Sequence, residues 1–265
     1  MAELILSVET AAGEVLASAS GQDEVWLTYA PQYRPGDRLC LSCGAADAFM
    51  VVQLDDAMSP AFVYCKEGKL SYPVPFEEGR KVFSERAFAG ENHYLHARMA
   101  RREEIAARKN LALNPWAAHQ FDGAYPFASA NVETRGEAVF AARNAIDGYK
   151  ANDSHGGWPY TSWGINRDPK AALRVDFGRT VEVDEAVLYL RADFPHDAWW
   201  QEGTLRFSDG SQVTVKLEKT AAGQRFSFPA KRVEWVVLDT LIKAGDPSPF
   251  PALTQLELWG NEWER

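Results

Sequence analysis

Two stretches in the second half of the chain carry side chains that suit the binding of a sugar. Residues 152–164, "NDSHGGWPYTSWG", and residues 191–200, "RADFPHDAWW", together hold four of the nine tryptophans. Indole rings cover the C–H face of a pyranose, and Arg, Asp and His side chains make the in-plane hydrogen bonds that distinguish stereoisomers. The two stretches therefore predict a non-catalytic carbohydrate-binding surface. Its predicted members are His155, Trp158, Trp163, Arg191, Asp193, Phe194, His196, Asp197, Trp199 and Trp200.

The tryptophans of these stretches allow two other interpretations. In one, they close the open end of a β-sandwich as core residues, because Trp is highly buried on average. Trp199 and Trp200 are adjacent, so in a strand they face opposite sides and at least one belongs to the core. In the other, the protein is an assembly module and a second copy of the chain covers the aromatic patch, giving a homo-oligomer.

A glycan-processing enzyme is the catalytic alternative. Glycosidases need two carboxylates about 5 to 10 Å apart, and Asp193, Asp197 and Glu202 are close in sequence. A metal site would combine the two histidines of these stretches with Asp153 or Asp193. The chain has no G-x-S-x-G elbow, Walker loop, dinucleotide fingerprint or H-E-x-x-H motif. The sequence therefore favours binding over catalysis.

The charge of the chain argues against two classes of partner. The formal net charge is -9 over 265 residues, and binding to nucleic acid or to an anionic membrane surface normally requires a basic patch. No apolar run approaches the roughly 20 residues that span a bilayer, and the N-terminus lacks a basic signal-peptide region. We therefore expect no nucleic-acid and no membrane partner. We expect a cytoplasmic protein, or a secreted one if a leader has been removed.

The three cysteines are predicted to be buried apolar side chains. Cys40, Cys43 and Cys65 form an odd number in one half of the chain, which does not suit a disulfide framework and fits a reducing compartment. The "CLSC" spacing supplies half of a zinc site, and no second half accompanies it. Residues three apart in a strand face opposite sides, which separates the two thiols.

The first ninety residues predict a β-sandwich. Seven segments alternate with period two: "ELILSVET", "EVLASAS", "EVWLTYA", "DRLCLSC", "AFMVVQL", "AFVYCK" and "KLSYPVP". Residues 91–120 then predict a helical connector, because Tyr94, Leu95, Met99 and Ile105 lie roughly at helical spacing among strong helix formers.

The remaining residues, 121–265, predict a second β-rich domain whose motifs resemble a known family. In order, the motifs are "ASANVETRGEAVFAARNAIDG", a loop with "SWG", "LRVDFGRTVEVDEAVLYLR", "FSDGS" and "FPALTQLELWG". Over residues 124–260 they resemble the galactose-binding-like, discoidin-type jelly rolls shared by coagulation-factor type C domains and many carbohydrate-binding modules. The resemblance implies a sugar site on loops at one end of the sandwich. The predicted fold class is all-β, with two β-sandwich domains joined by a helical connector.

The same resemblance implies a structural calcium ion. In the family, the loop at the "A-x-D-G" motif commonly holds calcium through an aspartate, backbone carbonyls and a glutamate from the last strand. The matching positions are Asp147 and Glu257, with Asp153 as a further oxygen ligand. Carboxylates and carbonyls are the oxygen ligands that calcium requires. The alternative is that Asp147 only caps a turn beside Gly148.

Overall fold

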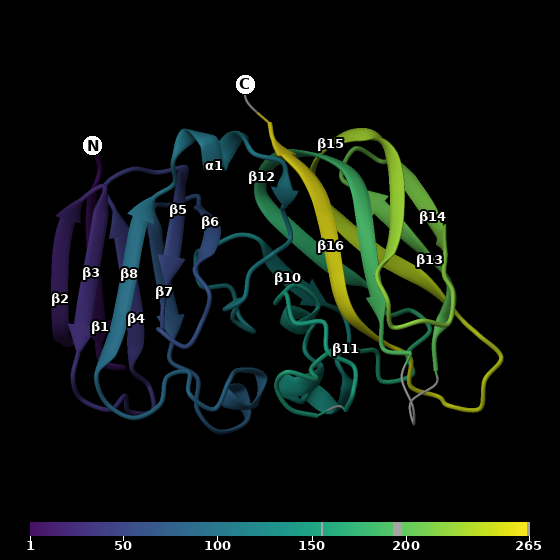
Figure 1. Ribbon diagram of the computed structural model, residues 1–265, viewed down its shortest axis with the longest axis horizontal. Helices are drawn as coiled ribbons and strands as arrows, with labels where there is room; N and C mark the ends of the chain where they lie inside the picture. Colours follow the sequence, from purple (N-terminus) through teal and green to yellow (C-terminus); the bar gives the residue numbers. More distant parts are fainter. Residues whose placement is uncertain (155, 193–197, 264–265) are drawn as a thin grey trace.

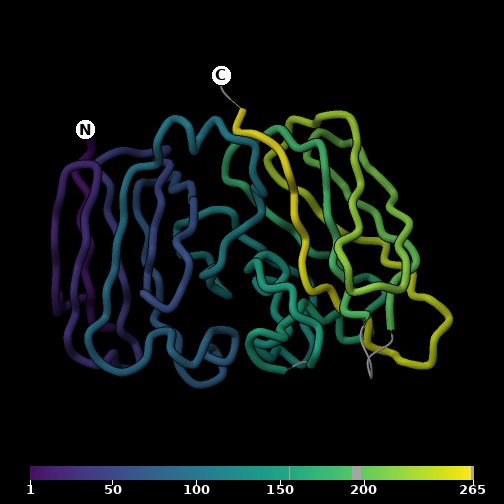
Figure 2. The backbone as a smooth tube through the Cα atoms, in the orientation of Figure 1, coloured from purple at the N-terminus to yellow at the C-terminus, as the bar shows by residue number. Residues whose placement is uncertain are grey.

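The computed structural model describes residues 1–154, 156–192 and 198–263. Two β-sandwiches lie side by side, the first coloured purple to blue and the second teal to yellow (Figure 1, and as a backbone trace in Figure 2). Within these ranges the longest helical segment has six residues, so none can span a bilayer. The predicted all-β class with two β-sandwiches is confirmed.

All seven strands predicted in the first ninety residues are present. They are β1 (Glu3–Glu9), β2 (Val15–Gln22), β3 (Glu24–Tyr29), β4 (Arg38–Cys43), β5 (Ala48–Gln53), β6 (Ala61–Cys65) and β7 (Lys69–Pro73). With β8 (His93–Met99) they form two four-stranded sheets, in the orders β2-β1-β4-β7 and β3-β8-β5-β6. Apolar residues alternate along the strands because one face of each sheet packs on the other; Leu4, Leu6 and Val8 of β1 are fully buried.

The predicted helix is wrong over residues 93–99, which form strand β8. This strand pairs with β3 and β5, and His93, Leu95 and Ala97 are buried while Tyr94 is exposed. The burial therefore follows period two, and the adjacent Tyr94 and Leu95 face opposite sides of the sheet. The only helix in the predicted connector, of the residues described, is α1 (Arg102–Ala106), followed by the two-residue strand β9 (Lys109–Asn110).

The cysteines behave as the strand geometry requires. Cys43 is buried, with its Sγ 3.9 Å from the Met99 Sδ, whereas Cys40 is half-buried on the other face of β4, 3.5 Å from the Ser71 hydroxyl. Cys65 is fully buried, and burial raises the pKa of its thiol to about 12. This thiol is a poor nucleophile and a poor metal ligand, since both roles need the thiolate.

The second sandwich is a curled sheet with the strand order β11-β16-β12-β15-β13-β14. Its elements are β10 (Phe127–Ala130), η2 (Thr134–Gly136), η3 (Ala138–Phe140), η4 (Ala142–Ala145), β11 (Trp163–Gly164), β12 (Leu173–Leu190), β13 (Trp200–Phe207), β14 (Gln212–Lys216), β15 (Gln224–Lys243) and β16 (Ala252–Glu262). β12 is 18 residues long and β15 is 20 residues long. In β12 the pairing shifts between Asp176 and Val181, where Gly178 has a φ of 70°, so the strand bends instead of ending.

A hairpin turn at "SDGS" joins the antiparallel strands β13 and β14. The Phe207 N–H donates to the Ser211 carbonyl (3.0 Å), and Gly210 has the positive φ of 83° that the turn needs. The Asp209 carboxylate accepts hydrogen bonds from the Ser211 N–H (2.8 Å) and hydroxyl (2.6 Å). These bonds lower the pKa of Asp209 because they stabilise its charged form.

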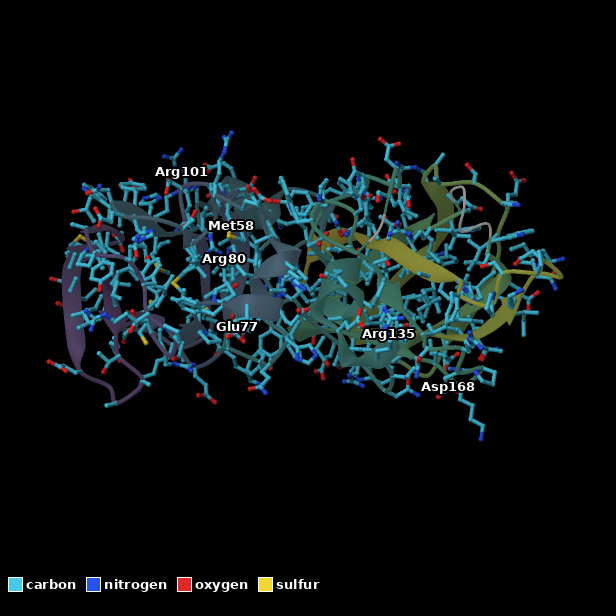
Figure 3. The ribbon with its side chains drawn as sticks, turned by 90° about the horizontal axis from the view of Figure 1, so that it is seen from below. Met58, Glu77, Arg80, Arg101, Arg135 and Asp168 are labelled. Atoms are coloured by element: carbon cyan, nitrogen blue, oxygen red, sulfur yellow. The ribbon has the colours of Figure 1, made fainter. Side chains whose placement is uncertain are left out.

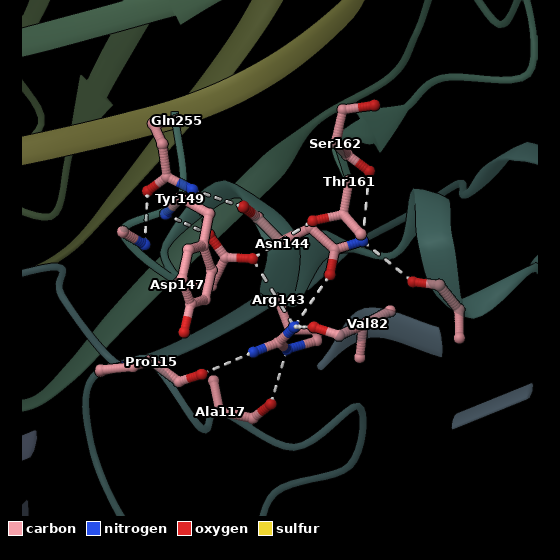
Figure 4. Close-up of polar contacts among 12 residues, drawn as sticks. Val82, Pro115, Ala117, Arg143, Asn144, Asp147, Tyr149, Thr161, Ser162 and Gln255 are labelled. Atoms are coloured by element: carbon pink, nitrogen blue, oxygen red, sulfur yellow. Dashed lines mark hydrogen bonds and ion pairs between the residues drawn. The ribbon is translucent and has the colours of Figure 1, made fainter. Parts of the chain in front are cut away.

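A buried arginine joins the two sandwiches (Figure 4). Arg143, at 3% exposure, lies in η4, and its Nη1 reaches the Val82 carbonyl (3.4 Å) at the end of η1 (Glu77–Val82) in the first sandwich. Its other contacts are the Ala117 carbonyl (2.8 Å), the Pro115 carbonyl (3.0 Å), the Asn144 Oδ1 (3.0 Å) and the Asp147 Oδ2 (3.7 Å). The Phe83 ring lies 4.7 Å from its guanidinium carbon. One side chain therefore connects both sandwiches and the segment between them.

A buried carboxyl at the start of the second half gives stability a pH dependence. The Asp122 Oδ1 accepts the Ala124 N–H (3.0 Å), while its Oδ2 has no partner among the described residues. Burial raises the pKa of Asp122 to about 7. The folded state therefore holds the proton more tightly than the unfolded state, whose pKa is about 3.9. The raised pKa of Asp122 therefore stabilises the folded state fully at a pH below the unfolded-state pKa. This stabilisation is lost as the pH rises through 7.

We expect Asp122→Asn to flatten the fall in stability between pH 4 and pH 7. One proton corresponds to a slope of up to about 1.4 kcal/mol per pH unit in the free energy of unfolding. Burial also raises the pKa of Asp147 to about 7, so the variant keeps part of the slope. Urea unfolding of wild type and variant at pH 5 and pH 8 measures it. Equal pH dependence in the two proteins would contradict this assignment.

Candidate functional site

Two of the four predicted binding tryptophans lie in the core of the second sandwich. Trp163 is 0% and Trp200 1% exposed, and their ring centroids are 6.4 Å apart. The Trp163 Nε1 donates to the Val132 carbonyl (3.0 Å). Neither ring can stack on a ligand in solvent, so their prediction as binding residues is corrected. Both lie in strands whose inward face supplies the core, where a large apolar ring is most stable.

The other two tryptophans are half-buried and lie in different surroundings. Trp199 packs against the core of the second sandwich. Trp158 contacts the first sandwich: its backbone N–H donates to the Lys81 carbonyl (2.8 Å), and its ring meets Tyr149 edge-on at 5.3 Å. Trp158 lines a cavity of about 430 Å³ together with Glu77 and Arg80, which Figure 3 labels on the first sandwich. Trp158 thus lies at the junction of the sandwiches.

Arg191 is the predicted polar residue that the structure places at the end of the second sandwich. It is 4% exposed, and its guanidinium donates to the Tyr160 carbonyl (2.8 Å) and to the Ser154 carbonyl. The backbone N–H of Arg191 donates to the Ala252 carbonyl (3.0 Å) at the start of β16. Arg191 therefore joins the end of β12 to the 152–164 stretch and to the start of β16. The predicted residues His155, Asp193, Phe194, His196 and Asp197 lie outside the described residues.

A small pocket opens where these loops meet, and we call it the end-loop pocket. Its volume is about 180 Å³, below the roughly 300–1,000 Å³ of sites for drug-sized ligands. It therefore suits a ligand with one ring. The pocket lies at the end of β12, at β11 and at the start of β16, and Figure 3 labels one of its lining residues, Arg135. Its lining is Thr134, Arg135, Phe140, Ser162, Gly164, Ile165, Asn166, Arg191, Phe250, Pro251 and Ala252.

The wall of the end-loop pocket contains a buried hydroxyl without a partner. Ser162 is 0% exposed, and its Oγ has no hydrogen-bond partner within the described part of the chain. Beside it, the Thr134 hydroxyl accepts the Asn166 N–H (2.9 Å). A Cβ on Gly164 would lie 2.6 Å from the Thr134 Oγ1, so only glycine allows this close approach. An unpaired buried hydroxyl is costly unless a ligand or water bonds to it.

The rim of the pocket combines an exposed ring, two arginines and residues with a strained backbone. Phe250 is 39% exposed, and the Arg167 guanidinium lies over its ring at 4.2 Å. Arg135 is likewise 5.4 Å from the Phe140 ring centroid. Arg135, Asn166 and Arg167 all have positive φ values, 55°, 48° and 63°. Such conformations cost about 1–3 kcal/mol each and gather at ligand sites, where the surrounding structure holds them.

Sequence reasoning missed the residues that form most of this pocket. Thr134, Arg135, Asn166 and Phe250 come from three loops far apart in the chain, and none stands in a tryptophan-rich stretch. One local signal existed: Phe250 lies between Pro249 and Pro251. A proline on each side disfavours helix and central strand, which predicts a loop with an aromatic side chain near its surface.

The Asp147 carboxylate is surrounded by donors rather than by calcium ligands (Figure 4). It accepts the Tyr149 N–H (2.9 Å), the Gln255 amide (2.5 Å) and the Thr161 hydroxyl (3.3 Å), and it lies 3.7 Å from Arg143. N–H groups and a guanidinium cannot coordinate a cation. The environment of Asp147 therefore fits the turn-capping alternative and does not fit calcium, which needs six to eight oxygen ligands.

Glu257 is likewise paired within the protein. Its carboxylate forms an ion pair with Lys150 and accepts the Trp259 Nε1–H (2.8 Å). Asp153 is exposed. In the described ranges, no three His, Cys, Asp or Glu side chains are grouped so as to hold a metal ion. Calcium binding stays a prediction, and these pairings would have to open for it to occur.

A family model described as a domain of unknown function (DUF7402) matches residues 122–245. No curated protein matches the chain.

Three similar solved structures are small sugar-binding modules. Chitosan-binding module 1 from a chitosanase/glucanase of Paenibacillus sp. IK-5 is 22% identical, covering 57% of this chain and 99% of that one, with a TM-score of 0.40. The family 32 module of C. perfringens NanJ in complex with galactose is 20% identical, covering 50% and 91%, with a TM-score of 0.39. A fucose-binding module of Streptococcus pneumoniae, SpX-3, is 14% identical, covering 58% and 99%, with a TM-score of 0.42.

Proposed function

We propose that this protein binds a carbohydrate in the end-loop pocket. The observation that carries the proposal is the meeting of an exposed aromatic ring, Phe250, with an unpartnered hydroxyl, Ser162, in a pocket of about 180 Å³. A sugar presents both an apolar C–H face and hydroxyl groups, so it uses both kinds of contact at once. A carbohydrate is also the ligand class that the sequence motifs imply.

The ring of Phe250 supplies the apolar contact. Arg167 lies over this ring at 4.2 Å, which restrains its orientation. The exposed part of the ring is available to cover the C–H face of a pyranose. This contact is less extensive than the four-tryptophan platform that the sequence predicts, because Trp163 and Trp200 are buried.

The polar contacts come from the pocket wall and rim. The Ser162 hydroxyl can both donate and accept, and the Asn166 side chain offers an amide oxygen and an NH₂ group. The Arg135 guanidinium is fixed by two hydrogen bonds to the Glu137 carboxylate (2.5 and 2.8 Å), so its position at the rim is defined. We infer a neutral saccharide as the ligand, with modest affinity because a small site gains little area against the desolvation of the sugar.

The test is a glycan array followed by calorimetry on wild type and Phe250→Ala. We expect at least one glycan to bind, and Phe250→Ala to weaken that binding by about tenfold, since an aromatic contact contributes roughly 0.5–1.5 kcal/mol beyond the area it buries. Phe121→Ala is the matched control, because Phe121 is also an exposed phenylalanine (49%) and does not line the pocket. Equal affinity in both variants, or no glycan bound at all, would refute the proposal.

A further inference from the structure

A second and larger cavity lies between the two sandwiches, and we call it the interdomain groove. Its volume is about 490 Å³, within the roughly 300–1,000 Å³ of ordinary ligand sites. One wall is the end of the first sandwich at Phe62 of β6, and the other is β16 at Glu257 and Trp259. Figure 1 shows β6 and β16 on the facing sides of the two sandwiches, with the segment that contains β9 between them.

The lining of the interdomain groove is cationic, although the chain carries a net charge of -9. Arg108, Lys109, Lys150 and Arg179 line the groove, against a single carboxylate, Glu257. A concave site whose lining has an excess of one sign of charge attracts ligands of the opposite sign. This concentration of positive charge is therefore the first indication of an anionic ligand.

The four cations are paired with carboxylates, of which only Glu257, the partner of Lys150, lines the groove. Asp184 pairs with Arg108 (2.9 Å), and Glu262 binds Arg179 through two hydrogen bonds (2.5 and 2.7 Å). Lys109 lies 3.8 Å from the same Glu262 carboxylate. These pairs restrain long side chains that would otherwise lose conformational entropy when a ligand binds. The groove therefore presents cations whose positions are set in advance.

Two of the lining residues keep N–H groups for a ligand. The Asn110 Oδ1 accepts the Ala112 N–H (3.1 Å) and the Leu258 N–H (3.0 Å), which fixes the side chain and leaves its NH₂ group unbonded within the described residues. Arg108 forms its ion pairs through Nη2, to Asp184 and Glu185, and 41% of its side chain is exposed, so a ligand can reach the guanidinium. The groove is thus rich in donors, as recognition of a carboxylate or sulfate requires.

Aromatic rings form part of both walls. The Trp259 indole donates to the Glu257 carboxylate (2.8 Å), which sets the orientation of its ring. Phe62 faces the groove from the first sandwich, with the Lys109 ammonium 4.7 Å from its ring centroid. Flat rings beside charged donors suit a ligand that has both a ring with C–H faces and an anionic substituent.

We propose that the interdomain groove is a second binding site, for an anionic saccharide that bears carboxylate or sulfate groups. Its residues are separate from those of the end-loop pocket, so the proposal does not depend on sugar binding there. The anion contacts Arg108, Asn110 and Lys150, and a sugar ring lies against Trp259.

The test compares three oligosaccharide probes by calorimetry: trigalacturonate, a sulfated galactotriose and neutral galactotriose. We expect the anionic probes to bind, with affinity that falls from 50 to 300 mM salt, and the neutral probe not to bind in the groove. The carboxylated and sulfated probes together show which anion is preferred. Anionic probes that bind no more tightly than the neutral one would overturn the proposal.

Two variants locate this binding. Asn110→Asp keeps the oxygen that accepts the two backbone N–H groups, and it replaces the free donor by a negative charge. Arg108→Gln removes one cation. Each is expected to weaken anionic binding by about tenfold, as loss of a hydrogen bond to a charged group does. Arg206→Gln is the matched control, because Arg206 is similarly exposed (45%) and similarly paired, with Asp239 at 2.8 Å.

The variant Phe250→Ala separates the two sites. We expect it to leave anionic binding unchanged, whether or not it affects a neutral glycan. Thermal melting of each variant verifies that the fold is intact. The groove is not the site if Arg108→Gln and Asn110→Asp leave anionic binding unchanged. It is also not the site if Phe250→Ala abolishes anionic binding. A failure of neutral-glycan binding alone would count only against the end-loop pocket.

Discussion

Replacing Arg143 with methionine is expected to lower the free energy of unfolding by about 3–5 kcal/mol, the usual loss when one partner of a buried ion pair is removed. Methionine keeps much of the volume but offers no donors. Asp147 would be left buried without its cation, and the carbonyls of Ala117, Pro115 and Val82 would lose their partner. Urea unfolding followed by circular dichroism measures the effect.

Two further variants show whether the unpaired charge causes this loss. The double variant Arg143→Met with Asp147→Asn removes the buried carboxylate and should recover part of the stability. Arg206→Met, on the surface, removes an exposed ion pair and is expected to cost about 1 kcal/mol or less. An Arg143→Met protein as stable as the Arg206→Met protein would show that Arg143 does not hold the two sandwiches together.

Trp200→Ala is expected to cost about 3–5 kcal/mol in the free energy of unfolding, as for other large aromatic residues removed from a core. Trp200 is 1% exposed and packs beside Trp163, so its loss leaves a cavity in the core. Trp199→Ala is the matched comparison, because the neighbouring Trp199 is only partly buried and should cost less. A larger loss of unfolding free energy for Trp199→Ala than for Trp200→Ala would contradict the assignment of Trp200 to the core.

The strands were predictable where one side chain in two is buried. The segments that became β1 to β7 alternate because each lies between a core and solvent, and the seven predictions hold. The same rule applies to β8, but Tyr94, Leu95 and Met99 also fit a helical spacing and lie beside the helix formers of residues 100–106. A short segment cannot distinguish the two periods, and pairing with β3 and β5 decided the outcome.

The candidate site was less predictable because residue type does not determine exposure. Four tryptophans in two loop-like stretches suggested a stacking platform, yet Trp163 and Trp200 belong to strands and fill the core. The residues that form the end-loop pocket are brought together by the ends of β12, β11 and β16. Their closeness follows from the sheet order, which sequence spacing does not contain.

The calcium prediction depended on two carboxylates, and neighbouring cations in the structure pair with both of them. Asp147 and Glu257 match the positions that the resemblance implies. Arg143 and Lys150, also visible in the sequence near the "A-x-D-G" motif, supply the positive charges that these carboxylates contact. A motif that contributes carboxylates therefore has to be considered together with the cations around it.

The most direct test of sugar binding at the end-loop pocket is a ¹H–¹⁵N NMR titration with the tightest glycan from the array. We expect the amide resonances of Thr134, Gly164, Ile165 and Asn166 to shift in proportion to the bound fraction, and the Trp200 indole resonance to stay in place. Shifts confined to residues away from this pocket, or no shift at saturating glycan, would contradict the proposed function.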